Sequence, residues 1–151
     1  MSASCLIDTN VLLRFVKPDD SDYGLVRSVV VRLSVTKVDL CYTSQILGEF
    51  WNACTRPADR NGYGLSILET DRRARLIEAQ FRLLVDSPAV DAEWRTLLVT
   101  HSVSGAQVHD ARLAASMGVH RVRSILSFNA SYFSRFSGLH IVDPRLVASH
   151  G

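Results

Sequence analysis

The sequence predicts a single α/β domain in which helices cover both faces of a mostly parallel sheet. Short apolar runs typical of buried strands alternate with longer segments of helical periodicity. Strands that are separated by helices need crossover connections and therefore run parallel. The chain has 151 residues, of which 47% are hydrophobic, and this is enough for one domain, residues 1–151, with a full core.

The first half of the chain is expected to contain two strands and three helices. Proline ends two of these helices, because it lacks a backbone N–H and disfavours helical backbone in the residue before it. In chain order the segments are the strand CLI before Asp8, the helix TNVLLRFV before Pro18, a helix within 19–35, a strand at 39–44, a helix at 44–56 before Pro57 and a turn-rich loop at 56–64.

Capping signals mark the helices of the second half. A Ser followed three residues later by Glu or Gln forms a capping box, Ser before Pro favours a helix start, and Gly favours a helix end. The expected helices run from Ser66 with Glu69 to Leu84 or earlier, from Ser87 and Pro88 to about Val103, and from Ser104 with Gln107 to Gly118. The apolar segments 122–128 and 140–144 are predicted to be two late strands.

Charge and cysteine content narrow the function classes. The formal net charge is only +2, which permits a nucleic-acid partner without indicating one. The three cysteines, Cys5, Cys41 and Cys54, have no CxxC spacing, so we expect buried free thiols of a reducing compartment rather than disulfides or a zinc site. The sequence shows no signal peptide and no apolar run long enough to cross a membrane, and it therefore predicts a cytoplasmic protein.

Asp8 and Asp110 are carboxylates in apolar surroundings. Asp8 follows a predicted buried strand, and ligands of parallel sheets gather where the strands end. Asp110 falls inside the apolar stripe of its helix, beside Leu113, Ala114 and Met117. Burying a carboxylate is costly unless something compensates its charge. The opposite side of this helix, made of His109, Arg112 and Ser116, is expected to face water.

Glu49 lies at the flank of the apolar stripe of the helix 44–56. Taken singly, each acid has a structural explanation: Asp8 can cap the helix that begins at Thr9, Asp110 can pair with an arginine, and Glu49 can be solvated. Together they favour a metal site, because clustered carboxylates repel one another and burial raises their pKa. Hard oxygen donors without a suitable His or Cys set favour Mg²⁺ or Mn²⁺.

Four stretches in order resemble the PIN domain and, within it, the VapC-type ribonuclease toxins of type II toxin-antitoxin systems. They are LIDTNVLL, SQILGEFWNACTR, VHDARLAA, and ILSFNASYF followed by FSGLHIVDP. The resemblance implies a three-layer α/β/α sandwich around a mostly parallel sheet. It also implies that Asp8, Glu49 and Asp110 are the catalytic acids and hold Mg²⁺ or Mn²⁺, Glu49 directly or through water.

The resemblance also extends to neighbouring polar residues. Asn10 and Ser44 match positions that support the acids by hydrogen bonds, although helix starts need such polar residues too. Ser127 and Asn129 are candidate neutral oxygen donors. The family often carries a fourth acid just before the phenylalanine of the closing loop, and this chain has Tyr132 there.

The expected function is that of a metal-dependent endoribonuclease that hydrolyses RNA with a metal-activated water. The resemblance implies an antitoxin partner and a homodimer. One alternative is a weakened or inactive PIN-fold module that binds RNA or protein, and Tyr132 favours it. Another is a phosphohydrolase with Asp8 as nucleophile, but such enzymes carry a second Asp two residues on, where this chain has Asn10.

Overall fold

The computed structural model describes residues 3–149, which form one five-stranded sheet with all strands parallel. The strands are β1 (Ser4–Ile7), β2 (Asp39–Thr43), β3 (Arg82–Leu84), β4 (Ser124–Leu126) and β5 (His140–Val142). Their order across the sheet is β3-β2-β1-β4-β5. The chain therefore moves outward from β1 to β3 and then returns to the other side of β1, which makes the β1/β4 boundary a topological switch point.

Seven α-helices and two 3-10 turns accompany these strands in the described part of the chain, and all but the last helix lie between strands. The helices are α1 (Thr9–Phe15), α2 (Tyr23–Val35), α3 (Ser44–Thr55), α4 (Ile67–Gln80), α5 (Pro88–Thr100), α6 (Gln107–Val119) and α7 (Pro144–Ser149). The 3-10 turns are η1 (Ala58–Arg60) and η2 (Ala130–Phe133).

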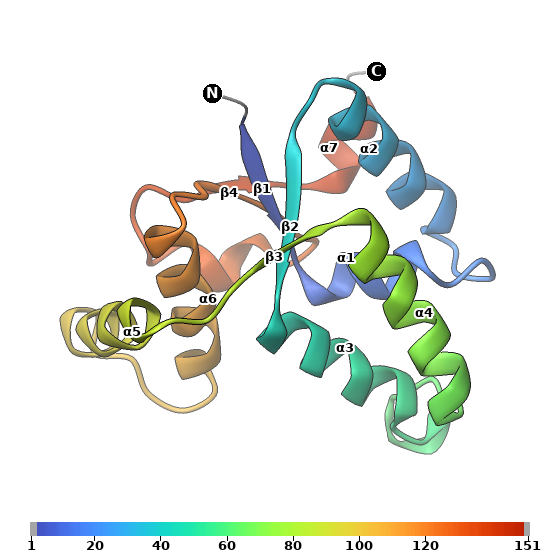
Figure 1. Cartoon of the computed structure of the whole chain (residues 1–151), viewed down its shortest axis with the longest axis horizontal. Coiled ribbons are helices and arrows are strands. Elements are labelled where there is room, and N and C mark those ends of the chain that lie inside the picture. Colours follow the sequence, from blue (N-terminus) through green and yellow to red (C-terminus); the bar gives the residue numbers. More distant parts are fainter. Residues whose placement is uncertain (1–2, 150–151) are drawn as a thin grey trace.

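The helices form two groups, one on each side of the sheet. Figure 1 shows α5 and α6 together on one side, with α1, α2, α4 and α7 on the other. In the first group α5 packs on α6, and in the second α1 contacts α2 and α3, while α2 contacts α7. The predicted α/β fold with helices on both faces is confirmed.

The core lies between the sheet and these helices and explains the apolar runs of the sequence. Leu6 and Ile7 of β1, with Ile125 and Leu126 of β4, are completely buried. Strands with both faces covered need apolar residues at successive positions, rather than in alternation. The central strand β1 and its neighbour β4 are therefore packed on both faces, and the residues that directly follow them lie at the edge of this core.

Several details of the second half differ from the sequence prediction. The helix from Ser66 ends at Gln80, and β3, an edge strand that the prediction lacked, follows it. Ser66 caps α4 and Ser87 caps α5 as expected. The capping box of Ser104 and Gln107 is wrong, because α6 begins after Ala106 without a side-chain cap. Gly118 does not end α6, which continues to Val119, and α7 was not predicted.

The three cysteines are free and buried, as expected. Burial raises the pKa of the Cys5 thiol to about 12 and the pKa of Cys41 and of Cys54 to about 11. Such thiols stay protonated and unreactive near neutral pH. Among the described residues, no helix is long and apolar enough to cross a membrane.

Candidate active site

Asp8 lies at the switch point of the sheet. It directly follows β1, and its backbone N–H donates to the carbonyl of Leu126 at the end of β4 (3.0 Å). Ile7 is paired with Leu126 in the parallel register, so Asp8 and Ser127 leave the sheet side by side. This edge, where the carboxyl ends of β1 and β4 meet, is where ligands bind in open parallel sheets.

The Asp8 carboxylate is buried, with 8% of its residue surface exposed, and neutral donors surround it. Its Oδ1 accepts the Thr9 backbone N–H (2.8 Å), which makes Asp8 the cap of α1. Its Oδ2 accepts the Ser127 hydroxyl (2.8 Å) and the Asn10 amide (3.3 Å). Asp8 therefore caps α1, which is the structural explanation that the sequence allowed. The capping bond uses only Oδ1, so Oδ2 is available for the other donors.

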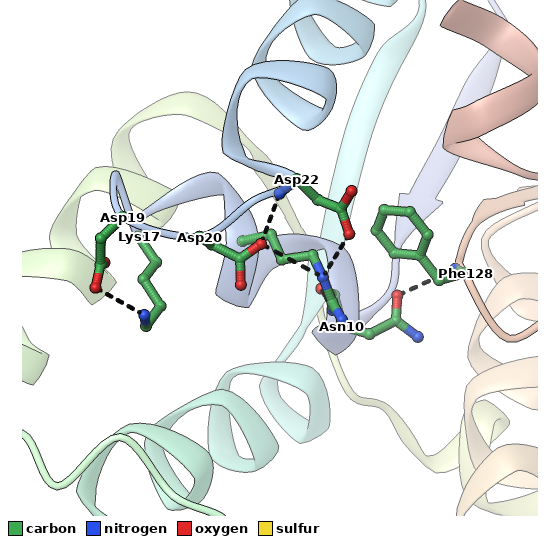
Figure 2. A network of polar contacts seen from close by, with 7 residues as sticks. Asn10, Lys17, Asp19, Asp20, Asp22 and Phe128 are labelled. Atoms are coloured by element: carbon green, nitrogen blue, oxygen red, sulfur yellow. Dashed lines mark hydrogen bonds and ion pairs between the residues drawn. The ribbon is translucent and has the colours of Figure 1, made fainter.

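Asn10 connects Asp8 to the loop after β4. Its amide also lies 3.3 Å from the Ser127 hydroxyl, and its Oδ1 accepts the Phe128 backbone N–H (3.2 Å). Figure 2 shows this contact close to Asp20 and Asp22. Arg14 forms ion pairs with both of these acids, with Asp20 at 3.9 Å and with Asp22 at 3.5 Å. Asn10 thus fixes the position of the β4 loop relative to α1.

Glu49 lies on α3 and is held by two neutral side chains. Thr9 donates its hydroxyl to Glu49 Oε2 (2.8 Å), and Gln45 donates its amide to Glu49 Oε1 (3.1 Å). The helix itself is anchored by the Thr43 hydroxyl, which accepts the Ile46 N–H and caps α3. Because Thr9 follows Asp8, its bond draws the Glu49 carboxylate toward the carboxyl end of β1.

The charges of the three acids interact. Burial, first of all, and the nearby charge of Glu49 raise the pKa of Asp8, against the lowering effect of its hydrogen bonds with Ser127, Thr9 and Asn10. Burial and the charges of Asp8 and Glu49 raise the pKa of Asp110, while His109 lowers it. The topology therefore places all three acids within electrostatic reach of one another.

In the described part of the chain, no Lys or Arg forms an ion pair with Asp8, Glu49 or Asp110, and His109 is the one positive side chain that favours the charged form of Asp110. Within residues 3–149, no three His, Cys, Asp or Glu side chains converge closely enough to surround one ion. The acids are thus neighbours at one edge of the sheet rather than a closed set of ligands, as mutual repulsion favours.

Three other residues that the sequence placed at the site, Ser44, Asn129 and Tyr132, are exposed and make no described side-chain contact with the acids. Ser44 is exposed, and no described hydrogen bond joins it to the acids; its neighbour Thr43 caps the helix instead. Asn129 is exposed and donates its backbone N–H to the Ser127 hydroxyl (3.0 Å). Tyr132 lies on η2 with 57% of its surface exposed, and its ring is therefore not buried in a cleft.

Two expectations for α6 are wrong. Ser116 is buried rather than solvated, because α6 packs against both α5 and η2 and has little free surface. Arg112 is half-buried rather than solvated: its guanidinium forms an ion pair with Asp86 (3.2 Å) and lies over the Trp94 ring (5.8 Å). His109 is exposed, as expected.

Sequence reasoning missed Thr9 and Gln45 as partners of Glu49. Thr9 looked like an ordinary first residue of a helix, and its bond to Glu49 spans 40 positions of sequence. Gln45 is four residues before Glu49, which places the two on one side of α3. This spacing was a usable signal for Gln45, whereas Thr9 offered none.

The fold is similar to that of several solved toxin structures. VapBC2 from Rickettsia felis, bound to a promoter DNA fragment, matches with a TM-score of 0.67 and 12% identity over 93% of this chain and 98% of that one. VapBC-1 from nontypeable Haemophilus influenzae matches with a TM-score of 0.68 and 13% identity over 94% and 98%. VapC20 from Mycobacterium tuberculosis, a sarcin-ricin loop cleaving toxin, matches with a TM-score of 0.63 and 17% identity over 87% and 95%.

These likenesses cover nearly the full length of VapC and FitB toxins, which have the PIN-domain fold. At such identities they show the fold alone. No protein-family model matches the sequence, and no curated protein matches it. The chain therefore has a PIN-like α/β fold, and its chemistry has to be argued from its own residues.

Proposed function

We propose that this chain, whose fold is that of the PIN-domain toxins, is a Mg²⁺- or Mn²⁺-dependent endoribonuclease. Asp8, Glu49 and Asp110 are its catalytic acids, and Asn10, Ser127 and Thr9 position them. VapC20 is a toxin that cleaves the sarcin-ricin loop, and a similar structure from Klebsiella pneumoniae is a toxin-antitoxin complex. By analogy, this chain is the toxin of a pair, forms a homodimer and binds an antitoxin protein.

One observation carries this proposal: three carboxylates lie within electrostatic reach at the switch point of the sheet, and none of them has a Lys or Arg ion-pair partner among residues 3–149. Capping of α1 explains Asp8 alone, but it does not explain why Glu49 and Asp110 lie close enough to repel it, since like charges in partly buried surroundings are unfavourable. A hard divalent cation removes the repulsion, and carboxylate oxygens are the ligands it prefers. The donor chemistry of the site therefore fits Mg²⁺ or Mn²⁺.

The residues have distinct roles in this proposal. Asp8 is the most firmly held acid, since Ser127, Asn10 and the Thr9 backbone fix both of its oxygens. Asp110 accepts no described hydrogen bond, so no donor among residues 3–149 fixes the orientation of its carboxylate. When bound, a divalent ion would acidify a water as nucleophile and neutralise charge on the phosphate. Asp8, Glu49 and Asp110 together would fix that ion relative to the scissile bond.

Cleavage of structured RNA tests the proposal. We expect cleavage with Mg²⁺ or Mn²⁺ that stops with chelator and leaves 5′-phosphate and 3′-hydroxyl ends, because water is the nucleophile. Asp8→Asn should abolish cleavage, and Asp91→Asn, an exposed acid on α5, serves as the control. Products with 2′,3′-cyclic phosphate ends would rule out attack by water and contradict the mechanism.

A second candidate function is an inactive PIN-fold module that binds RNA or protein. Tyr132 favours it, since a tyrosine is uncharged near neutral pH and cannot replace a fourth carboxylate. Under this alternative, RNA binds but is not cut at any concentration of Mg²⁺ or Mn²⁺. We favour catalysis, because Asp8, Glu49 and Asp110 are all retained at the sheet edge.

A further inference from the structure

Helix α6 carries Asp110 in its first turns but lacks a side-chain cap of its own. Its N-cap residue is Ala106, which cannot accept a hydrogen bond through its side chain. Neighbouring helices hold this end instead. Trp94 of α5 donates its indole N–H to the Val108 carbonyl (2.9 Å), and Gln45 of α3 donates its amide to the His109 carbonyl (2.9 Å). The placement of Asp110 therefore depends on residues outside α6.

Gln45 contacts both α3, which carries Glu49, and α6, which carries Asp110. The same amide nitrogen that binds the His109 carbonyl also donates to Glu49 Oε1 (3.1 Å). The other Glu49 oxygen accepts the Thr9 hydroxyl, and Thr9 directly follows Asp8. A continuous series of contacts thus runs from Asp8 through Glu49 and Gln45 to the residue before Asp110.

Arg112 fixes the orientation of the Gln45 amide. Its guanidinium lies 3.5 Å from Gln45 Oε1 and is held by the ion pair with Asp86. With the amide oxygen facing this cation, the amide NH₂ faces Glu49 and the His109 carbonyl. A reversed amide would bring two oxygens together at Glu49, which is unfavourable.

We propose that Gln45 is a positioning residue that sets the separation of Glu49 and Asp110 and thereby the affinity of the site for its divalent cation. This inference rests on the proposed function of the three acids. Gln45 touches neither ion nor substrate and acts through the carboxylate of Glu49 and the first turn of α6. Partners of metal ligands that act in this way typically change metal affinity about 10-fold to 100-fold when removed.

Titration calorimetry of the metal-free full chain with Mn²⁺ tests this role. We expect Gln45→Ala to bind Mn²⁺ roughly 10-fold more weakly or worse. Gln45→Met keeps the length of the side chain without its hydrogen bonds and should show the same loss. Asn52→Ala, an exposed polar residue on the same helix, is the matched control and should bind as the wild type does. Thermal unfolding with chelator should change little among these variants.

The outcomes separate this inference from the proposed function. A wild type that binds Mn²⁺ while both Gln45 variants bind equally well would overturn the inference alone. A Gln45→Met variant with normal affinity beside a weakened Gln45→Ala would show that packing matters rather than hydrogen bonds, and would also overturn it. A wild type without Mn²⁺ binding would overturn the proposed function and this inference together.

Discussion

Replacing Asp110 with Asn should stabilise the metal-free protein. Burial and the charges of Asp8 and Glu49 raise the pKa of Asp110, so its charged form is less favourable in the folded chain than in the unfolded chain. No described hydrogen bond reaches its side chain, so the isosteric amide loses no partner. Water screens a half-buried site, and we therefore expect a gain of only about 1 kcal/mol in the free energy of unfolding.

For a domain of this size, such a gain raises the Tm by roughly 2–4 °C. The pH dependence of this contribution to stability is opposite to that of most carboxylates, whose folded pKa is lowered. Because the folded pKa of Asp110 lies above its ordinary value of 3.8, the destabilising effect of its charge is present at neutral pH and fades as the pH falls through the folded pKa toward that value. The advantage of Asp110→Asn should consequently be greatest at neutral pH and disappear below about pH 4.

Thermal unfolding with chelator, at neutral and at acidic pH, measures this difference. Asp91→Asn is the matched control, since Asp91 is the fourth residue of α5 as Asp110 is of α6, and it is exposed. Both variants remove a negative charge near a helix N-terminus, and this loss is therefore common to both. If Asp110→Asn is no more stable than Asp91→Asn at neutral pH, the repulsion among the three acids is refuted and Asp110 is a structural residue.

Three other predictions concern the site and the assembly. Asp8→Asn and Glu49→Gln should each remove most RNA cleavage while circular dichroism shows the folded protein; retained cleavage in either variant would exclude that acid from catalysis. Tyr132→Asp should tighten Mn²⁺ binding and lower the metal concentration for half-maximal cleavage, because a fourth carboxylate adds charge around the ion; equal binding by both proteins would place Tyr132 away from the site. Light scattering should show a dimer at micromolar concentration, and a monomer with and without a partner protein would contradict the assembly.

The position of Asp8 could be predicted because two local signals agree there. A short run of buried residues predicts a central strand, and a carboxylate directly after such a strand lies at the edge where ligands bind. In the structure, β1 pairs in parallel with β4, and this pairing places Ser127 next to Asp8. Local patterns were sufficient here, because the relevant contacts are backbone contacts of regular elements.

Patterns failed where tertiary contacts override local preference. The strand β3 has only three residues, two of them exposed, so its sequence continues the pattern of the helix before it. The chain adopts positive φ at Ser102 and Gly105, and α6 begins after Ala106 rather than at Ser104. The bonds of Thr9 to Glu49 and of Gln45 to His109 join residues 40 and 64 positions apart, and a single sequence carries no record of such pairs.

The account depends on the claim that Asp8, Glu49 and Asp110 bind one divalent cation together. Anomalous diffraction from a crystal of the protein grown with Mn²⁺ tests it most directly, because the method locates the ion without reference to activity. We predict a manganese peak at the carboxyl ends of β1 and β4, within coordination distance of Asp8 and Asp110, with Glu49 bound directly or through water. A protein that shows no peak there at millimolar Mn²⁺, or a peak that contacts none of these three acids, would contradict the claim.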